Sequence, residues 1–203
     1  MASTRFRRII ADLAVDVSPL DDEEAETQKA ILQWVASGAP LFRTHPPDIP
    51  PMHLAVYLAL LDEKQEAVLL VDHIKADLWL LPGGHVDPDE DPRHTPLREA
   101  KEELGVTIEF HAGVGDRPVF LTVTATRGLH PHTDVTFWFV AQGDRTTPLA
   151  GDPGEFRSVA WFDLAATDWA DGRFDPQMAR FACKLRRTLD GRPGETPSWS
   201  GAS

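Results

Sequence analysis

Three glutamates within five residues give this sequence its clearest sign of chemistry. Glu99, Glu102 and Glu103 follow a stretch that reads as a strand, a glycine turn and a loop. On a helix of 3.6 residues per turn, positions i, i+3 and i+4 share one face, so the three carboxylates are expected to point the same way. Like charges so placed repel by roughly 0.2–0.5 kcal/mol per pair. A hard cation such as Mg²⁺ turns that repulsion into binding, so the pattern indicates a divalent-metal site for a phosphate substrate.

A solvated acidic helix face is the alternative reading of these glutamates, and the neighbouring residues weigh against it. Eight positions fall into the register of the Nudix box: Gly84, Glu90, Arg98, Glu99, Glu102, Glu103, Gly105 and Val106. The sequence therefore strongly resembles a Nudix hydrolase. The one soft deviation is Ala100, where a larger aliphatic residue is more usual, and a small apolar residue there is expected to pack.

The resemblance implies roles for the residues of the box. Glu99, Glu102 and Glu103 resemble the family's ligands for Mg²⁺, with Mn²⁺ as a substitute, and Glu103 is the most central of them. The carbonyl of Gly83 is a further candidate ligand. Arg98 is expected to form charge-assisted hydrogen bonds to Glu90 and to a box glutamate, which would fix the loop against the helix. On this reading Arg98, Glu99 and Glu103 are catalytic-site residues.

The general base is less well defined than the metal ligands, because family members resemble one another more in the box than in the base. Glu155 stands just before an expected strand, in the kind of loop position where such a carboxylate occurs. Asp152 is its competitor. A base must come within hydrogen-bond reach of the attacking water, which a sequence does not show.

Composition limits the size of the substrate. The chain has 203 residues with 42% hydrophobic content, enough for one good core and too few for two large domains. Its net charge of -12 opposes tight binding to long nucleic acid. A small phosphorylated molecule, with a nucleotide as the leading candidate, is expected instead, held through metal ions that neutralise the site. Nudix proteins often dimerise, so a homodimer is a further expectation.

Localisation is expected to be cytoplasmic. Cys183 is the only cysteine, so no internal disulfide can form, and its place in a late helix favours core packing. The N-terminal apolar stretch is interrupted by Asp12 and Asp16, which argues against a secretory signal. No stretch approaches the ~20 apolar residues of a membrane span, so no membrane association is expected.

The apolar pattern predicts an α/β fold, and the resemblance implies a Nudix α/β/α sandwich with a mixed β-sheet and a small N-terminal helical extension. Ser18 or Asp21 can cap a helix that runs to about Ala36, followed by an extended, proline-rich connector at 45–53. Residues 1–51 are thus expected to form the extension and connector, 52–190 the Nudix domain and 191–203 a disordered tail. Strands are predicted at 54–61, 67–73, 78–81, 106–110, 119–126, 135–140 and 159–162, and helices from Pro92 or Pro96 to Leu104 and at about 175–189.

Two histidines outside the box are the remaining candidates for chemistry. His130 and His132 have a spacing that can put both on one face of a strand. They are expected to shape a loop near the substrate, because no cysteine or matching third ligand for zinc stands nearby in the sequence. Charge alone marks further candidate substrate contacts: His53, Arg117, Arg127 and Arg157.

The expected reaction is the Mg²⁺-dependent hydrolysis of a pyrophosphate linkage. A nucleoside or deoxynucleoside triphosphate, cleaved to monophosphate and pyrophosphate, ranks first, and a nucleotide sugar or ADP-ribose follows. A non-catalytic nucleotide-binding sensor is the alternative of another class, although such a protein is expected to lose box glutamates and this chain keeps all of them. An isoprenoid diphosphate isomerase ranks lower, because Cys183 is poorly placed as its catalytic cysteine.

Overall fold

A mixed seven-stranded sheet forms the centre of the computed structural model, which describes residues 4–44, 50–126 and 131–191. Strands β1 (Met52–Asp62) and β6 (Thr133–Gln142) run parallel and pair from Met52/Thr133 to Leu61/Gln142. The strand order is β3-β2-β1-β6-β5, with β4 also paired to β1 and β7 to β2. The remaining strands are β2 (Ala67–His73), β3 (Leu78–Leu80), β4 (Gly83–His85), β5 (Phe120–Ala125) and β7 (Phe156–Asp163).

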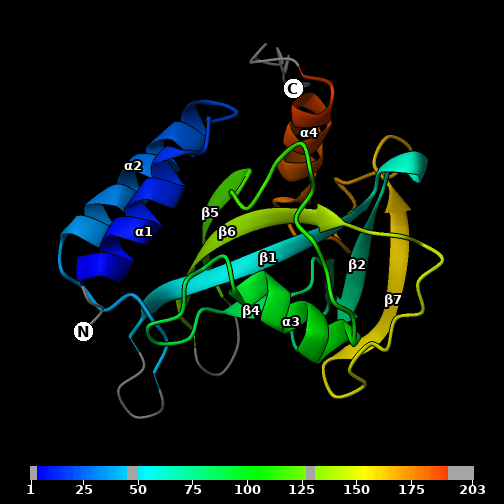
Figure 1. Ribbon diagram of the computed structural model, residues 1–203, viewed down its shortest axis with the longest axis horizontal. Helices are drawn as coiled ribbons and strands as arrows, with labels where there is room; N and C mark the ends of the chain where they lie inside the picture. Colours follow the sequence, from blue (N-terminus) through cyan, green and yellow to red (C-terminus); the bar gives the residue numbers. More distant parts are fainter. Residues whose placement is uncertain (1–3, 45–49, 127–130, 192–203) are drawn as a thin grey trace.

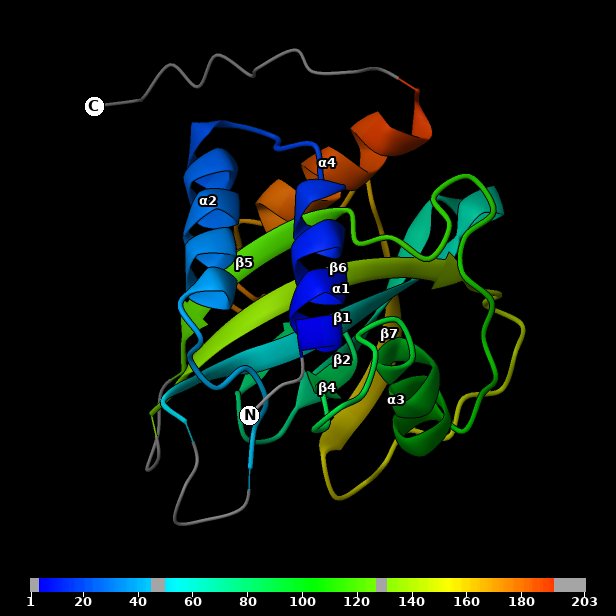
Figure 2. The same cartoon turned by 60° about the vertical axis from the view of Figure 1, so that its left-hand side comes forward.

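Strand β1 is buried on both faces because helices cover both sides of the sheet. Side chains alternate between the two faces of a strand. On one face, Leu54 and Val56 pack under α1 (Thr4–Val15) and α2 (Asp22–Ala36). On that same face, Leu58 and Leu60 pack under α3 (Thr95–Leu104). The helices therefore form layers on either side of the strands (Figures 1 and 2).

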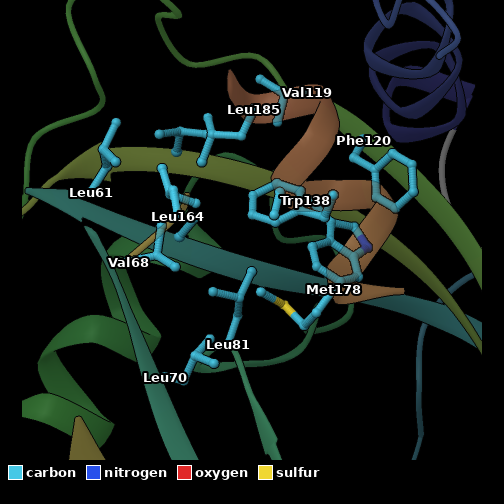
Figure 3. Packing of buried hydrophobic residues seen from close by; sticks show 14 of the residues in the cluster. Leu61, Val68, Leu70, Leu81, Val119, Phe120, Trp138, Leu164, Met178 and Leu185 are labelled. Carbon is cyan, nitrogen blue, oxygen red and sulfur yellow. The ribbon is translucent and has the colours of Figure 1, made fainter. Parts of the chain in front are cut away.

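Helix α4 (Met178–Leu189) covers the opposite face of the sheet. Its residues Met178 and Leu185 pack with Trp138 and Phe120 in one buried apolar cluster, shown in Figure 3. Trp138 is fully buried, and its indole Nε1 donates to Thr122 Oγ1 at 3.0 Å, so the ring's single polar group is satisfied. This cluster fixes α4 on the sheet across β1, β2, β5 and β6.

A buried ion pair ties the N-terminal helices to the rest of the molecule. Glu24 on α2 is fully buried, and its carboxylate accepts hydrogen bonds from Lys184 Nζ of α4 at 2.6 and 2.7 Å. The same carboxylate accepts from the backbone N–H of Leu121 at 3.1 Å, on the edge strand β5. One side chain therefore joins α2, α4 and the sheet edge, and it satisfies a backbone donor that an edge strand would otherwise expose.

Most of the predicted elements are present. The helix capped by Asp21 is confirmed as α2, where the Asp21 carboxylate accepts from the N–H of Glu24. The strands predicted at 54–61, 67–73, 78–81, 119–126, 135–140 and 159–162 correspond to β1, β2, β3, β5, β6 and β7, and the last helix begins at Met178. The mixed sheet between helices confirms the predicted fold class.

Other predictions were wrong or incomplete. Residues 106–110 form no strand, because Ile108 turns into the core beside α3 and only Phe110 bridges to Ala141. Helix α1 was not predicted. The Gly83–Gly84 turn is itself a short strand, β4. Part of the predicted connector, at 45–49, and the tail at 192–203 lie outside the described residues.

We predict that Lys184→Met lowers the free energy of unfolding by about 3–5 kcal/mol, because it leaves the Glu24 carboxylate buried without its cation. The double variant Glu24→Gln/Lys184→Met is expected to recover much of that loss. Urea unfolding followed by circular dichroism measures both. Lys29→Met is the matched control, because Lys29 forms an exposed pair with Glu26 and its loss should cost below about 0.5 kcal/mol. A Lys184 variant as stable as the control would refute the structural role of the pair.

Candidate active site

A close approach between β4 and α3 creates the site. Strand β4 pairs antiparallel with β1, with Val56 opposite Gly84 and Tyr57 opposite Gly83. A Cβ atom added at Gly83 would collide with the carbonyl oxygen of Val56, and one added at Gly84 would collide with the carboxylate of Glu99. Only glycine at these two positions lets the strand lie against β1 and the helix carboxylate lie on the strand.

Helix α3 has local signals that set its ends and its orientation. Pro96 stands in its first turn, and Gly105 ends it in a left-handed conformation with φ 70°. Ala100 and Leu104 are fully buried against the sheet, so the small residue at position 100 packs as expected. With that side fixed on the core, Glu99 and Glu103 are brought under β4.

Arg98 and Glu90 fix the loop that connects β4 to α3. The Arg98 guanidinium donates to Glu90 through Nε and NH2, both at 3.1 Å, and to the His85 carbonyl at 3.1 Å. Burial opposes ionisation of Glu90, but hydrogen bonds from Arg98, the Asp87 N–H and Thr95 hold its pKa below the usual value. The expected Arg98 to Glu90 contact is therefore present, and it joins the loop, β4 and the helix.

Arg98 also contacts the box glutamates. Its NH1 donates to Glu99 Oε1 at 2.8 Å and to Glu102 Oε2 at 3.1 Å. Glu99 is 8% exposed, whereas the side chain of Glu102 is 59% exposed. The three glutamates thus differ in setting, and Glu102 stands at the solvent side of the group.

Glu103 is the most strongly perturbed carboxyl of the site. It is 7% exposed, and its Oε2 accepts from the Gly83 N–H at 3.0 Å. Burial and the nearby carboxylates of Glu99 and Glu155 raise the pKa of Glu103 to about 9. Burial also raises the pKa of Glu99. Buried carboxylates this close together keep their negative charge only when a cation compensates it.

The loop at residues 150–155 brings Glu155 to this group. The N–H groups of Ala150 and Asp152 donate to the carbonyls of Leu104 and Glu103, each at 3.0 Å, so the loop caps the C-terminal end of α3. The Glu155 carboxylate lies close enough to Glu103 to raise the pKa of that carboxyl. The Asp152 carboxylate instead accepts from the Gly154 N–H at 2.7 Å and shapes the turn. Of the two predicted bases, the structure brings Glu155 to the box carboxylates.

The donor set fits a hard divalent cation. Glu99 and Glu103 offer oxygen ligands in a place where their mutual repulsion is uncompensated, and oxygen is the ligand atom that Mg²⁺ and Mn²⁺ prefer. Glu102 lies beside Glu99 because both accept from Arg98, and the backbone of Gly83 lies beside Glu103 because its N–H donates to that carboxylate. Mg²⁺ keeps several waters, so a few protein ligands suffice.

A second group of candidate metal ligands was not predicted from the sequence. His53, His85, His132 and Asp134 each offer one ligand atom, and these atoms lie within 4.8 Å of one another; we call them the histidine–aspartate cluster. The sequence analysis named His132 as part of a loop near the substrate and His53 as a candidate substrate contact. It did not connect them, because only the register of β1, β4 and β6 brings the group together. His130 lies outside the described residues.

The substrate contacts proposed on charge alone are mostly occupied elsewhere. His53 is fully buried, and Arg157 pairs with Asp72 at 2.9 Å and with Asp77 at 2.8 Å. Arg117 bonds to the Val114 carbonyl at 3.4 Å, and Arg127 lies outside the described residues. These four positions stay predictions as substrate contacts.

Comparison with protein families places this arrangement among known proteins. A family model described as NUDIX domain matches residues 51–185. A Bacillus subtilis (strain 168) protein provisionally named 8-oxo-dGTP diphosphatase is 39% identical over 66 residues, which are 32% of this chain and 44% of that protein. Mouse diphosphoinositol polyphosphate phosphohydrolase 3-alpha is 40% identical over 53 residues, 26% of this chain and 32% of that protein. The chain spans less than half the length of these curated relatives.

Solved structures share the fold. The MutT NUDIX hydrolase from Burkholderia pseudomallei matches with a TM-score of 0.51 and 20% identity, over 66% of this chain and 98% of that one. The C. elegans Ap4A hydrolase binary complex matches with a TM-score of 0.52 and 19% identity, over 68% and 98% of the two chains. No helix in the described ranges has the length and apolar character that crossing a membrane requires.

We predict different outcomes for alanine at the two glycines of β4. Gly83→Ala is expected to destabilise the protein by about 2 kcal/mol or more, because the new methyl group meets backbone that cannot move aside. Gly84→Ala should cost less, because it meets the end of a side chain and displaces Glu99. Thermal unfolding compares both with Gly172→Ala, whose added methyl group meets no atom within 4 Å. Equal stability of all three variants would contradict the close approach.

Proposed function

Because this chain belongs to the Nudix family, we propose that it hydrolyses a pyrophosphate linkage in a nucleoside diphosphate derivative with the help of Mg²⁺. The observation that carries the proposal is the meeting of Glu99, Glu103 and Glu155 beside the glycine turn of β4. A solvated acidic helix face would leave these carboxylates apart and exposed. Here Glu99 and Glu103 are buried. Among the described residues, Arg98 is the cation that compensates this charge, through its hydrogen bond to Glu99.

Charge neutralisation is the main requirement of the reaction. Water must reach a phosphorus atom that negative oxygens shield, so positioning and electrostatic stabilisation dominate the barrier. When bound, the metal supplies charge neutralisation at the phosphate oxygens and makes a coordinated water easier to deprotonate. Glu99, Glu102 and Glu103, with the Gly83 carbonyl, are the ligands we propose for it, and Mn²⁺ is expected to replace Mg²⁺.

The chain's own residues hold this group in place and manage the proton. Arg98 keeps Glu99 and the loop at Glu90 in fixed positions, so it acts as a positioning residue. Glu155 is the general base that we propose, because its side chain lies near Glu103, whereas the Asp152 carboxylate accepts from the Gly154 N–H within the turn. Its place in a loop docked on the end of α3 keeps it near the box when the substrate binds.

A nucleoside or deoxynucleoside triphosphate, cleaved to monophosphate and pyrophosphate, is the substrate class that we propose first. The relative from Bacillus subtilis, whose name includes 8-oxo-dGTP, supports this choice. The acidic surface disfavours long nucleic acid. A nucleotide sugar or ADP-ribose is the alternative substrate. Cytoplasmic residence and a homodimer stay predictions from the sequence.

A panel of nucleotides tests the proposed function. The purified protein with Mg²⁺ is expected to release pyrophosphate and monophosphate from at least one nucleoside triphosphate, and the products report which phosphorus is attacked. Release only from a nucleotide sugar or ADP-ribose would select the alternative substrate. Binding of nucleotides without release of any product would overturn the enzymatic proposal in favour of a sensor.

The variant Glu103→Gln is the matched test of the site in the same assay. Turnover is expected to fall by orders of magnitude, because a metal ligand is lost. The fold should persist, since the amide is isosteric with the protonated carboxyl that a pKa of about 9 favours without metal. Glu109→Gln, at an exposed position beyond the helix, is the control and should keep full activity. Near-normal turnover of Glu103→Gln would refute the role of Glu103.

The two candidate bases are separated by a pair of isosteric variants. Glu155→Gln is expected to lower kcat by about 10²–10⁴-fold, and raising the pH should not restore it, because the amide accepts no proton. Asp152→Asn should change kcat little, since an amide oxygen can still accept from the Gly154 N–H. Rates followed across a pH series decide between them. The opposite ranking of the two variants would transfer the base role to Asp152.

A further inference from the structure

The histidine–aspartate cluster is assembled by sheet register. His53 lies directly opposite Asp134 in the parallel pair β1/β6, and His85 lies opposite Ala55, two residues along β1 from His53. His132 precedes Asp134 by two residues, so alternation puts it on the same face. The four side chains therefore gather on one face of the sheet, at the end where β1 and β6 begin.

This face is the opposite one from the box carboxylates. Gly84 faces Glu99 of α3, and His85 is the next residue of β4. Successive side chains of a strand point to opposite sides, so the His85 ring points away from α3. The cluster is thus a separate constellation, which the proposed hydrolysis does not use.

The distances from the Asp134 carboxylate to the three rings match the edges of a tetrahedral metal site, and all four ligand atoms lie within 4.8 Å of one another. The Oδ1 atom of Asp134 lies 3.5 Å from His53 Nε2, 3.3 Å from His85 Nε2 and 3.3 Å from His132 Nε2. Zinc binds nitrogen and oxygen at about 2.0–2.2 Å, so the edges of its tetrahedron measure roughly 3.3–3.5 Å. Three nitrogens thus surround one carboxylate oxygen at the separations that a shared ion requires.

Hydrogen bonds at the far side of two rings direct lone pairs into the cluster. His53 Nδ1 lies 3.0 Å from the Pro50 carbonyl, which only accepts, so the proton of the neutral ring is on Nδ1. His132 Nδ1 lies 3.1 Å from Thr126 Oγ1, whose hydroxyl donates to the His132 carbonyl, which assigns His132 the same tautomer. In both rings Nε2 is then the unprotonated atom. Bonds of this kind orient histidines that bind metals.

Two unprotonated nitrogens facing a carboxylate oxygen repel it unless a cation lies among them. His53 is fully buried, and its Nε2 and the Oδ1 of Asp134 are buried without a hydrogen-bond partner. The rings of His53 and His132 stack with their centroids 4.7 Å apart.

His85 is the most adjustable of the four. Its Nδ1 accepts from Arg43 NH1 at 3.0 Å, so its neutral ring carries the proton on Nε2. Binding a metal through Nε2 requires that proton to move to Nδ1 and the exposed Arg43 side chain to turn away. Without that change, His53, His132 and Asp134 still provide three ligands.

We propose that His53, His132 and Asp134, with His85 as the fourth ligand, form a site for a transition-metal dication, with Zn²⁺ as the leading ion. Imidazole nitrogen suits zinc and its neighbours in the first transition row, whereas Mg²⁺ prefers oxygen. The two sites therefore separate ions by ligand type, oxygen at α3 and nitrogen at the cluster. The bound ion would join the beginnings of β1 and β6 to β4, whose His85 carbonyl accepts from Arg98 of the box.

The test is direct metal binding by the full chain without a polyhistidine tag. After removal of metal with EDTA and dialysis into buffer with excess Mg²⁺, Co²⁺ titration is expected to produce the visible absorption of tetrahedral Co²⁺ with nitrogen ligands. The signal should saturate near one ion per chain and disappear on addition of Zn²⁺, and Zn²⁺ should raise Tm. Absence of the absorption in this buffer would overturn the proposal, and so would its disappearance when more Mg²⁺ is added without Zn²⁺.

Variants locate the ion. His132→Gln and Asp134→Asn, both at partly exposed positions, are expected to weaken Zn²⁺ binding by more than the roughly 10–100-fold that loss of an outer hydrogen bond costs. Circular dichroism verifies that each variant is folded. His94→Gln, at an exposed histidine outside the cluster, and Glu103→Gln should keep wild-type affinity. Unchanged binding in both cluster variants, or loss of binding in Glu103→Gln, would assign the ion elsewhere and refute the site.

Discussion

The contact between the glycine turn of β4 and the carboxylates of α3 is the constraint on which the candidate active site depends. Without side chains at Gly83 and Gly84, the strand lies against β1 and the Glu99 carboxylate lies on the strand. The Gly83 N–H then meets Glu103. The cost is a set of buried, mutually repelling carboxyl groups, visible in the raised pKa of Glu103. Cation binding is what makes such an arrangement useful.

Other parts of the fold keep this contact in place. Ala100 and Leu104 fix one side of α3 on the core, and Arg98 connects the helix to the loop and to β4. The loop at 150–155 caps the end of α3 and positions Glu155. Further away, the Glu24 to Lys184 pair holds the N-terminal helices over the sheet edge. The proposed zinc site would add a connection between β4 and the central strands.

Local and periodic signals predicted much of the fold from the sequence. Asp21 as a cap, the apolar runs of β1 and β2 and the Gly105 stop all act over a few residues, so their elements were found. The box register predicted the Arg98 to Glu90 bridge for the same reason. Residues 106–110 looked like a strand, but tertiary packing beside α3 decided their conformation, which local propensity does not contain.

Sites built from distant residues were harder to predict. Glu155 is 52 positions from Glu103 along the chain, and only its place before a strand suggested it. His53, His85 and His132 come together through the pairing of β1 with β4 and β6, and no spacing along the chain encodes that register. Glu24 and Lys184 are 160 positions apart, and each reads alone as an ordinary surface charge.

Anomalous diffraction from crystals grown with Mn²⁺ locates the cation that we propose for the box carboxylates. We expect a manganese peak within bonding distance of the carboxylate oxygens of Glu99 and Glu103, next to the β4 turn. A protein that shows bound manganese only away from these two carboxylates, or whose Glu99 and Glu103 have turned out to solvent, would contradict it.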